Sequence, residues 1–146
     1  MSKIVHLMAG VALVAVTSLA FAEVFAIPAD QIDPKKVYWG EAAGFEKAGE
    51  VDYDSVVKAT PEYKELKKKK IERGTGKYWI LMSQASDRSA RAIAQVGQDT
   101  EYDLIAAQGY LGSLKPAIPA EDITKLILKQ LEQSLTKGES LAKGEK

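Results

Sequence analysis

The stretch TPEYKELKKKKIERGTGK, residues 60–77, predicts both the start of one helix and the turn that reverses the chain after it. Thr60 offers a hydroxyl oxygen to the free amides of the first turn. Pro61 suits the first helical position because the amide it lacks would have no partner there. A run of four lysines near the C-terminal end complements the helix dipole. Since Gly74-Thr75-Gly76 then favours a turn, we expect the helix to cover residues 61–73.

A second helix is predicted over residues 77–98. Small and apolar residues recur there at spacings of three and four, which is typical of a seam between paired helices: Tyr78, Met82, Ala85, Ser89, Ala92 and Val96. The glycine-containing turn that joins the two helices has only three residues. We therefore expect an antiparallel helical hairpin over about residues 61–98.

Segments with strand character lie on both sides of this hairpin. Residues 47–53 (KAGEVDY) alternate only weakly, whereas residues 102–107 (YDLIAA) form a compact apolar run typical of a strand. Glycines flank Tyr110 and Leu111, which suggests a turn and then a second short strand. Counting all three segments, we expect a small β body of about three short strands.

A last helix is expected after Pro116 and Pro119, which break the chain, with Asp122 able to cap it. Its apolar residues form one stripe: Ile123, Leu126, Ile127, Leu131 and Leu135. From Gly138 onward the chain is polar, so residues 138–146 are predicted to be a disordered tail. The sequence thus predicts an α+β fold, in which a small β body carries an antiparallel helical hairpin and a C-terminal helix.

Residues 23–44, ahead of that body, show no sustained periodicity and contain two prolines and two glycines. We expect an irregular N-terminal arm with Tyr38 and Trp39 docked on the core, and a binding role for this aromatic pair is the alternative. The α+β domain itself is expected to span residues 45–137.

The first 22 residues have the pattern of a cleavable signal peptide. Lys3 supplies a positive charge, and residues 7–20 (LMAGVALVAVTSLA) carry no charged side chain. Ala20-Phe21-Ala22 then places small residues where signal peptidase requires them. An uncleaved membrane anchor is the alternative, but the apolar run is short against the roughly 20 residues of a spanning helix. We expect cleavage after Ala22 and export to the periplasm of a bacterial envelope.

Cleavage there would remove His6, the only histidine, and the chain has no cysteine. Without either residue type, Ser-His-Asp and Cys-His catalysis and zinc sites of ordinary ligation are excluded. Asp52 and Asp54 lie two apart, a spacing that more often ends a strand and caps the next helix than forms a catalytic pair. We expect no enzyme activity, no metal and no cofactor. With Lys3 removed, 19 basic residues stand against 20 acidic ones, so we expect no nucleic-acid binding.

Two blocks of sequence, residues 50–66 and 92–131, carry a resemblance to a known family. The second block contains, in order, Asp103-Leu104-Ile105, Tyr110 and Asp122-Ile123-Thr124. This ordered set resembles the Skp/OmpH family of periplasmic chaperones. The resemblance implies a homotrimer whose helical hairpins surround a cavity and hold unfolded outer-membrane proteins without ATP. The predicted outgoing helix has 13 residues and a length of about 20 Å, so the resemblance would be to a short-armed relative.

Candidate site residues follow from this resemblance. Client binding is expected at four lysines and four neighbouring apolar residues: Lys67, Lys68, Lys69, Lys70, Trp79, Ile80, Leu81 and Met82. Because the strands are few and short, we expect the bodies to associate. The residues expected in that oligomerisation body are Val51, Leu104, Ile105, Tyr110, Leu111, Ile123 and Ile127.

Two functions remain open at this stage. One is a periplasmic, ATP-independent, chaperone-like protein that binds unfolded outer-membrane or envelope proteins. The other is a non-catalytic trimeric structural or interaction module of the envelope without holdase activity. The lysine run is itself open to three interpretations: a solvated helix face, attraction of an acidic client, or contact with an anionic membrane surface.

Overall fold

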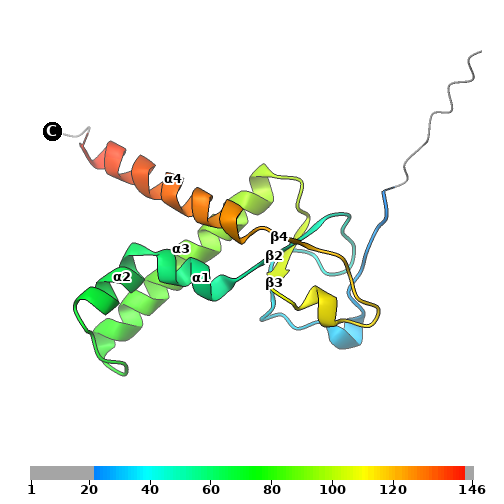
Figure 1. Cartoon of the computed structure of the whole chain (residues 1–146), viewed down its shortest axis with the longest axis horizontal. Coiled ribbons are helices and arrows are strands. Elements are labelled where there is room, and N and C mark those ends of the chain that lie inside the picture. The colour runs from blue at the N-terminus through cyan, green and yellow to red at the C-terminus, as the bar shows by residue number, and fades with distance from the viewer. Residues whose placement is uncertain (1–21, 144–146) are drawn as a thin grey trace, which may run out of the picture.

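The computed structural model describes the chain over residues 22–143, and its side chains as far as Glu139. Within this range the chain has an α+β fold with four α-helices and a mixed four-stranded sheet, which confirms the predicted fold class. The predicted signal peptide, apart from Ala22, lies outside the described residues. Figure 1 shows the helices gathered on one side of the molecule and the sheet with its loops on the other.

The sheet has the strand order β1-β3-β2-β4. β1 (Val37–Gly40) runs antiparallel to β3 (Leu104–Ala107). β2 (Ala48–Val51) runs parallel both to β3 and to the two-residue β4 (Glu121–Asp122). Because parallel neighbours need a long crossover connection, the helical hairpin is inserted between β2 and β3.

β1 corrects the prediction that residues 23–44 form an irregular arm. Val37–Gly40 lie along an edge of β3 that the sheet would otherwise leave open. Phe25, before β1, and Phe45, after it, form an antiparallel bridge in which each amide donates to the other carbonyl, at 2.7 and 2.9 Å. The arm is therefore part of the sheet, and a short 3-10 helix (Ala29–Gln31) lies between these two contacts.

The predicted strand around Tyr110 and Leu111 is wrong. Gly109 has a φ of 77°, which takes the chain off an extended path, and Leu111–Ser113 form a 3-10 helix. The carboxylate of Glu50 in β2 accepts hydrogen bonds from the amides of Gly109 (3.0 Å) and Leu111 (2.9 Å). The side chain of Glu50 thus holds this loop in place, whereas the predicted strand would have been held by backbone hydrogen bonds to a neighbouring strand.

Side-chain caps start the first two helices, and the cap at Thr60 is the one that the sequence predicts. Asp52 caps α1 (Tyr53–Ala59), and Thr60 caps α2 (Pro61–Lys68), each by accepting a hydrogen bond from an amide of the first turn. The longest helix, α3 (Gly76–Asp99), extends one residue beyond each predicted end.

The C-terminal helix α4 (Thr124–Lys143) corrects the predicted disordered tail. It continues through Gly138, so residues 138–143 are helical. The segment after that glycine, ESLAK, consists mostly of good helix formers, and a single unfavourable residue does not end the helix.

β3 is the centre of the core because both of its faces are buried. Leu104 and Ala106 belong to a cluster under the loops, and Ile105 belongs to a cluster under the helices, as the alternation of a strand requires. All three side chains are 0% exposed. The loops and the helices therefore cover opposite sides of one strand.

The residues predicted for an oligomerisation body belong to this core. Their exposed fractions lie between 0% and 6%: Val51, Leu104, Ile105, Tyr110, Leu111, Ile123 and Ile127. Side chains buried to this extent within one chain have no surface to offer a second copy, so their assignment to an interface is corrected. The reason is that α3, α4 and the loops cover the strands that the prediction left bare.

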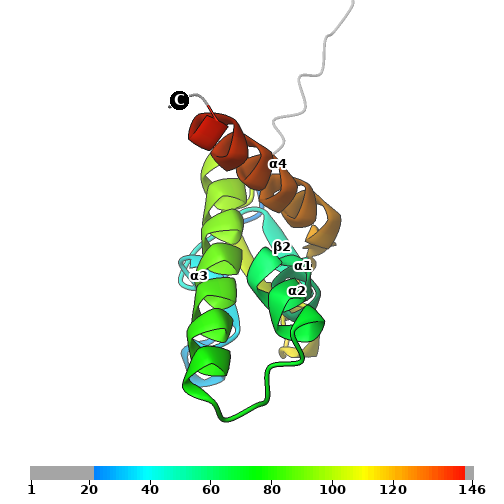
Figure 2. The same cartoon turned by 90° about the vertical axis from the view of Figure 1, so that its left-hand side faces the viewer.

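α2 and α3 form the predicted hairpin, and α4 crosses α3 (Figure 2). Along the predicted seam of α3, four residues are buried: Ala85, Ser89, Ala92 and Val96. Tyr78 and Met82, nearer the turn, are half-buried. Since α2 has eight residues and α3 has 24, α2 covers only part of its partner.

Gly97 allows the N-terminal segment to pack against α3. A Cβ added at Gly97 would lie 2.2 Å from Nε1 of Trp39. The neighbouring Tyr38 stacks on Tyr53, with 5.0 Å between the ring centroids. Both aromatic residues thus dock on the body, as the sequence indicates.

Gly97→Ala should destabilise the fold by about 1–3 kcal/mol, because the rigid indole ring leaves no room for a methyl group. The matched control is Gly138→Ala in α4, where an added Cβ meets nothing within 4 Å. Helix propensity should make that control more stable, by up to about 1 kcal/mol. Urea unfolding followed by circular dichroism measures both changes. Wild-type stability of the Gly97→Ala protein would contradict the packing of Trp39 on α3.

Candidate binding site at the hairpin tip

A loop joins α2 to α3 at one extremity of the molecule (Figures 1 and 2). We call residues 67–80 the hairpin tip. It comprises the end of α2, the loop and the first residues of α3. Six of the eight residues predicted to bind a client lie within these limits.

The backbone of Lys70 explains why α2 ends at Lys68 and not at the predicted Arg73. Lys70 has a φ of 50°, in the left-handed region. Its amide donates to the carbonyl of Lys67 (3.3 Å), and the next amide donates to the carbonyl of Leu66 (3.1 Å). This is the Schellman arrangement, whose left-handed position is usually glycine because a Cβ is strained there. The chain therefore leaves the helix at a lysine, ahead of the glycines.

The first turn of α3 contains no acidic residue, although it is the positive end of the longest helix. Lys77 lies there instead. Thr75 caps the helix, since its hydroxyl oxygen accepts from the amide of Tyr78 (3.2 Å) and donates to the carbonyl of Glu72 (2.9 Å). The charge of Lys77 and the helix dipole thus add to one another at the tip.

The tip carries an excess of positive charge that the chain as a whole lacks. It contains six cationic side chains and one carboxylate, an excess of five, whereas the full sequence is formally neutral. One of these cations is paired within the described residues. The Nζ of Lys69 lies 2.7 Å from Oε1 of Glu65, and this hydrogen bond lowers the pKa of Glu65. In residues 22–139, no ion pair is found for the other five: Lys67, Lys68, Lys70, Arg73 and Lys77.

Exposed apolar surface lies beside these charges. Trp79 and Ile80 are 56% and 60% exposed, which is high for large apolar side chains. The ring of Tyr78 meets that of Trp79 edge-on, with 5.2 Å between the centroids. A cationic, two aromatic and an aliphatic side chain thus follow one another in the first five residues of α3, from Lys77 to Ile80.

Two of the predicted apolar contact residues are corrected. Leu81 is 8% exposed and Met82 is half-buried, so neither presents its full side chain at the surface. Leu81 lies one helical turn before the buried Ala85 and therefore shares its face of α3. Sequence reasoning also missed Arg73 and Lys77 as members of the tip. The signal for Lys77 was present in the sequence, because no acid follows the Thr75 cap.

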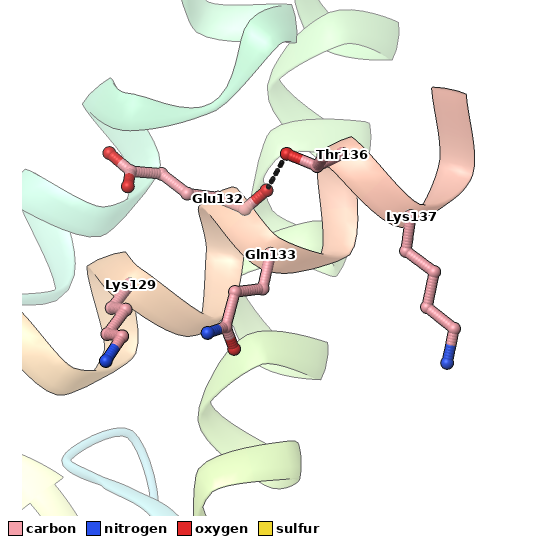
Figure 3. A pocket seen from close by; sticks show the side chains of 5 residues that line it. All are labelled: Lys129, Glu132, Gln133, Thr136 and Lys137. Atoms are coloured by element: carbon pink, nitrogen blue, oxygen red, sulfur yellow. Dashed lines mark hydrogen bonds between the residues drawn. The ribbon is translucent and has the colours of Figure 1, made fainter. Parts of the chain in front are cut away.

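Hollows also lie elsewhere on the described surface. Figure 3 shows one on the outer side of α4, lined by Lys129, Glu132, Gln133, Thr136 and Lys137. All five come from a single helix, and their charged ends point away from one another. Within residues 22–139, no group of acidic, histidine or cysteine side chains is placed to hold a metal ion. The helices of this range also include none with the length and apolar character needed to cross a membrane.

An ion pair between α2 and α3 stabilises the hairpin behind the tip. Two nitrogens of Arg88 donate to the carboxylate of Glu62, with Nη2 2.6 Å and Nε 2.9 Å from Oε1. Burial raises the pKa of Glu62, but the hydrogen bonds and charge of Arg88, with a backbone hydrogen bond, outweigh burial and leave it lowered. Glu62 is therefore held as an anion between the two helices.

In comparisons with protein-family models, with curated proteins and with solved structures, nothing matches this chain. The Skp/OmpH resemblance therefore stays a prediction based on the two sequence blocks.

Glu62→Gln should lower the free energy of unfolding by about 1 kcal/mol at pH 7, since water partly screens this pair. The folded pKa of Glu62 lies below its unfolded value, so the stabilisation is present above the unfolded pKa. It is lost as the pH falls through the folded pKa. Urea unfolding across the acid range should therefore show variant and wild type converging. Asp87→Asn, which removes an exposed carboxylate of α3, is the control and should change stability by less than about 0.5 kcal/mol. An Asp87→Asn effect as large as that of Glu62→Gln would contradict the role of the pair.

Proposed function

We propose that this protein is a non-catalytic, ATP-independent, chaperone-like binding protein of the bacterial periplasm. In this proposal it is exported by cleavage after Ala22 and binds unfolded outer-membrane or envelope proteins at the hairpin tip. The observation that carries the proposal is the exposure of Trp79 and Ile80 beside cations at an extremity of the fold. Holding an unfolded chain requires such surface and no reactive group.

Two kinds of contact would act together at the tip. Trp79 and Ile80 would take up apolar side chains that an unfolded protein exposes. The cations would attract its acidic segments and would raise the rate of encounter. One tip is small, so several copies would have to act together on one client. This need for several copies and the Skp/OmpH resemblance both support a homotrimer.

The length of the hairpin favours a second candidate, a trimeric structural or interaction module without holdase activity. The eight residues of α2 extend about 12 Å, and the 24 residues of α3 extend about 36 Å. A hairpin in which one helix is this short is not long enough to surround a cavity that holds a client protein. Such a module should recover one folded partner from envelope extracts, whereas a holdase should recover many unfolded ones.

The processed chain, residues 23–146, should slow the aggregation of an unfolded outer-membrane protein, as measured by light scattering after dilution from denaturant. Trp79→Ser with Ile80→Ser should remove most of this effect. Lys67–Lys70→Ala should weaken it, and added salt should do the same because it screens the attraction.

Val24→Ser with Leu126→Ser is the matched control for this assay, since it removes two exposed apolar side chains far from the tip. This control protein should protect the client as well as wild type does. Absence of protection by the wild-type chain, even in large excess, would refute the holdase and leave the interaction module.

Static light scattering of the processed chain at micromolar concentration should give the mass of a trimer. The buried strands mean that such a trimer would have to form through exposed helix or loop surfaces. A monomer mass would overturn the trimer in both candidate functions and would leave binding by a single tip as the activity to be tested.

A further inference from the structure

Two lysines of the tip occupy positions that local energetics disfavour. Lys70 lies in the left-handed conformation that glycine would adopt without strain. Lys77 lies in the first turn of a helix, where acidic residues stabilise and cations destabilise. Residues kept in locally unfavourable positions often mark a functional surface. Both residues are positively charged, so we expect the surface that they mark to bind anions.

The distribution of charge along the chain also indicates a surface that binds anions. The tip has an excess of five positive charges in a formally neutral sequence, so the rest of the chain carries a matching excess of negative charge. Five of the six cations are lysines, which act as flexible point charges, and only Arg73 has the planar fork suited to paired recognition. The tip therefore attracts a broad anionic surface more readily than one shaped anionic ligand.

Trp79 and Ile80 give the tip an exposed apolar surface as well as its charge. Consecutive residues of a helix lie about 100° apart, so these two exposed side chains cover adjacent faces of the first turns of α3. Tryptophan is favoured at the boundary between lipid headgroups and acyl chains, where its ring is apolar and its N–H stays wet. A projecting tip that carries cations and a tryptophan is suited to a lipid surface, because binding to such a surface requires no pocket in the protein.

We propose that the hairpin tip docks on an anionic membrane surface. In the docked state Trp79 and Ile80 lie at headgroup depth, and the tip lysines lie against lipid phosphates. The proposal rests on the proposed function, because it names a second partner for the same contact surface. It places the client-binding protein at the bilayer and not free in the compartment.

Co-sedimentation of the processed chain with phosphatidylcholine vesicles, with and without about 30% phosphatidylglycerol, tests this proposal. Binding should be at least about tenfold stronger to the anionic vesicles and should weaken with salt. Tryptophan emission should shift to shorter wavelength on binding. Trp79→Phe should abolish that shift, because the remaining Trp39 is already half-buried against α3.

Lys67–Lys70→Ala should weaken vesicle binding about tenfold or more. The matched control removes four exposed lysines elsewhere, Lys35, Lys125, Lys129 and Lys137, and should bind as wild type does. Lys70→Gly tests the strained position by itself: it should raise the midpoint of thermal unfolding while weakening binding severalfold.

The vesicle and aggregation assays separate this inference from the proposed function. Equal binding to neutral and anionic vesicles, or wild-type binding by Lys67–Lys70→Ala, would overturn membrane docking. Aggregation suppression that persists in that case would leave the client-binding function intact. Vesicle binding through the tip without aggregation suppression would support docking and refute the holdase.

Discussion

The parallel pairing of β2 with β3 is the constraint on which the rest of this structure depends. Two parallel neighbours cannot be joined by a tight turn, so the chain must leave the sheet and return to the same end of it. Residues 52–103 form this crossover connection and contain α1, α2 and α3. On the way back to the sheet, α3 packs against one face of β3. The N-terminal segment and the loop after β3 cover the opposite face. The hairpin is therefore part of the crossover connection, and its tip is the point of that connection farthest from the sheet (Figure 1).

Local signals predicted much of this arrangement. Asp52 and Thr60 cap helices because short polar side chains satisfy free amides, and the seam of α3 is buried where small residues recur. The features that the sequence did not predict depend on contacts between residues far apart in the chain. β1 exists because the edge of β3 is open to pairing, and Tyr110 lies in a loop because Glu50, sixty positions earlier, binds that loop. The supposed interface residues could not be recognised as core without knowing that α4 covers them. The export signal and the family resemblance remain predictions.

The residue types of the candidate site could be predicted from the sequence, but the backbone conformation of the tip could not. The lysine run and the exposed Trp79 were evident as residue types, but the conformation of Lys70 was not, because glycines four positions later offered the more obvious end of the helix. The tip thus combines a strained backbone, an uncompensated helix dipole and exposed apolar side chains. Each of these is unfavourable for an isolated chain. Together they are the features that support the proposed docking on an anionic and partly apolar partner.

The two edges of the sheet bear on how copies of this chain can assemble. β4 has only two residues, both acidic and exposed, and β1 is interrupted by a bulge. Short, charged or bulged edges resist the addition of further strands, because the incoming backbone finds few regular partners and meets like charges. A protein that handles unfolded chains is at particular risk of templating cross-β growth on them. Both margins of this sheet oppose such growth, so in the proposed function a client would be received by side chains of the helical arm.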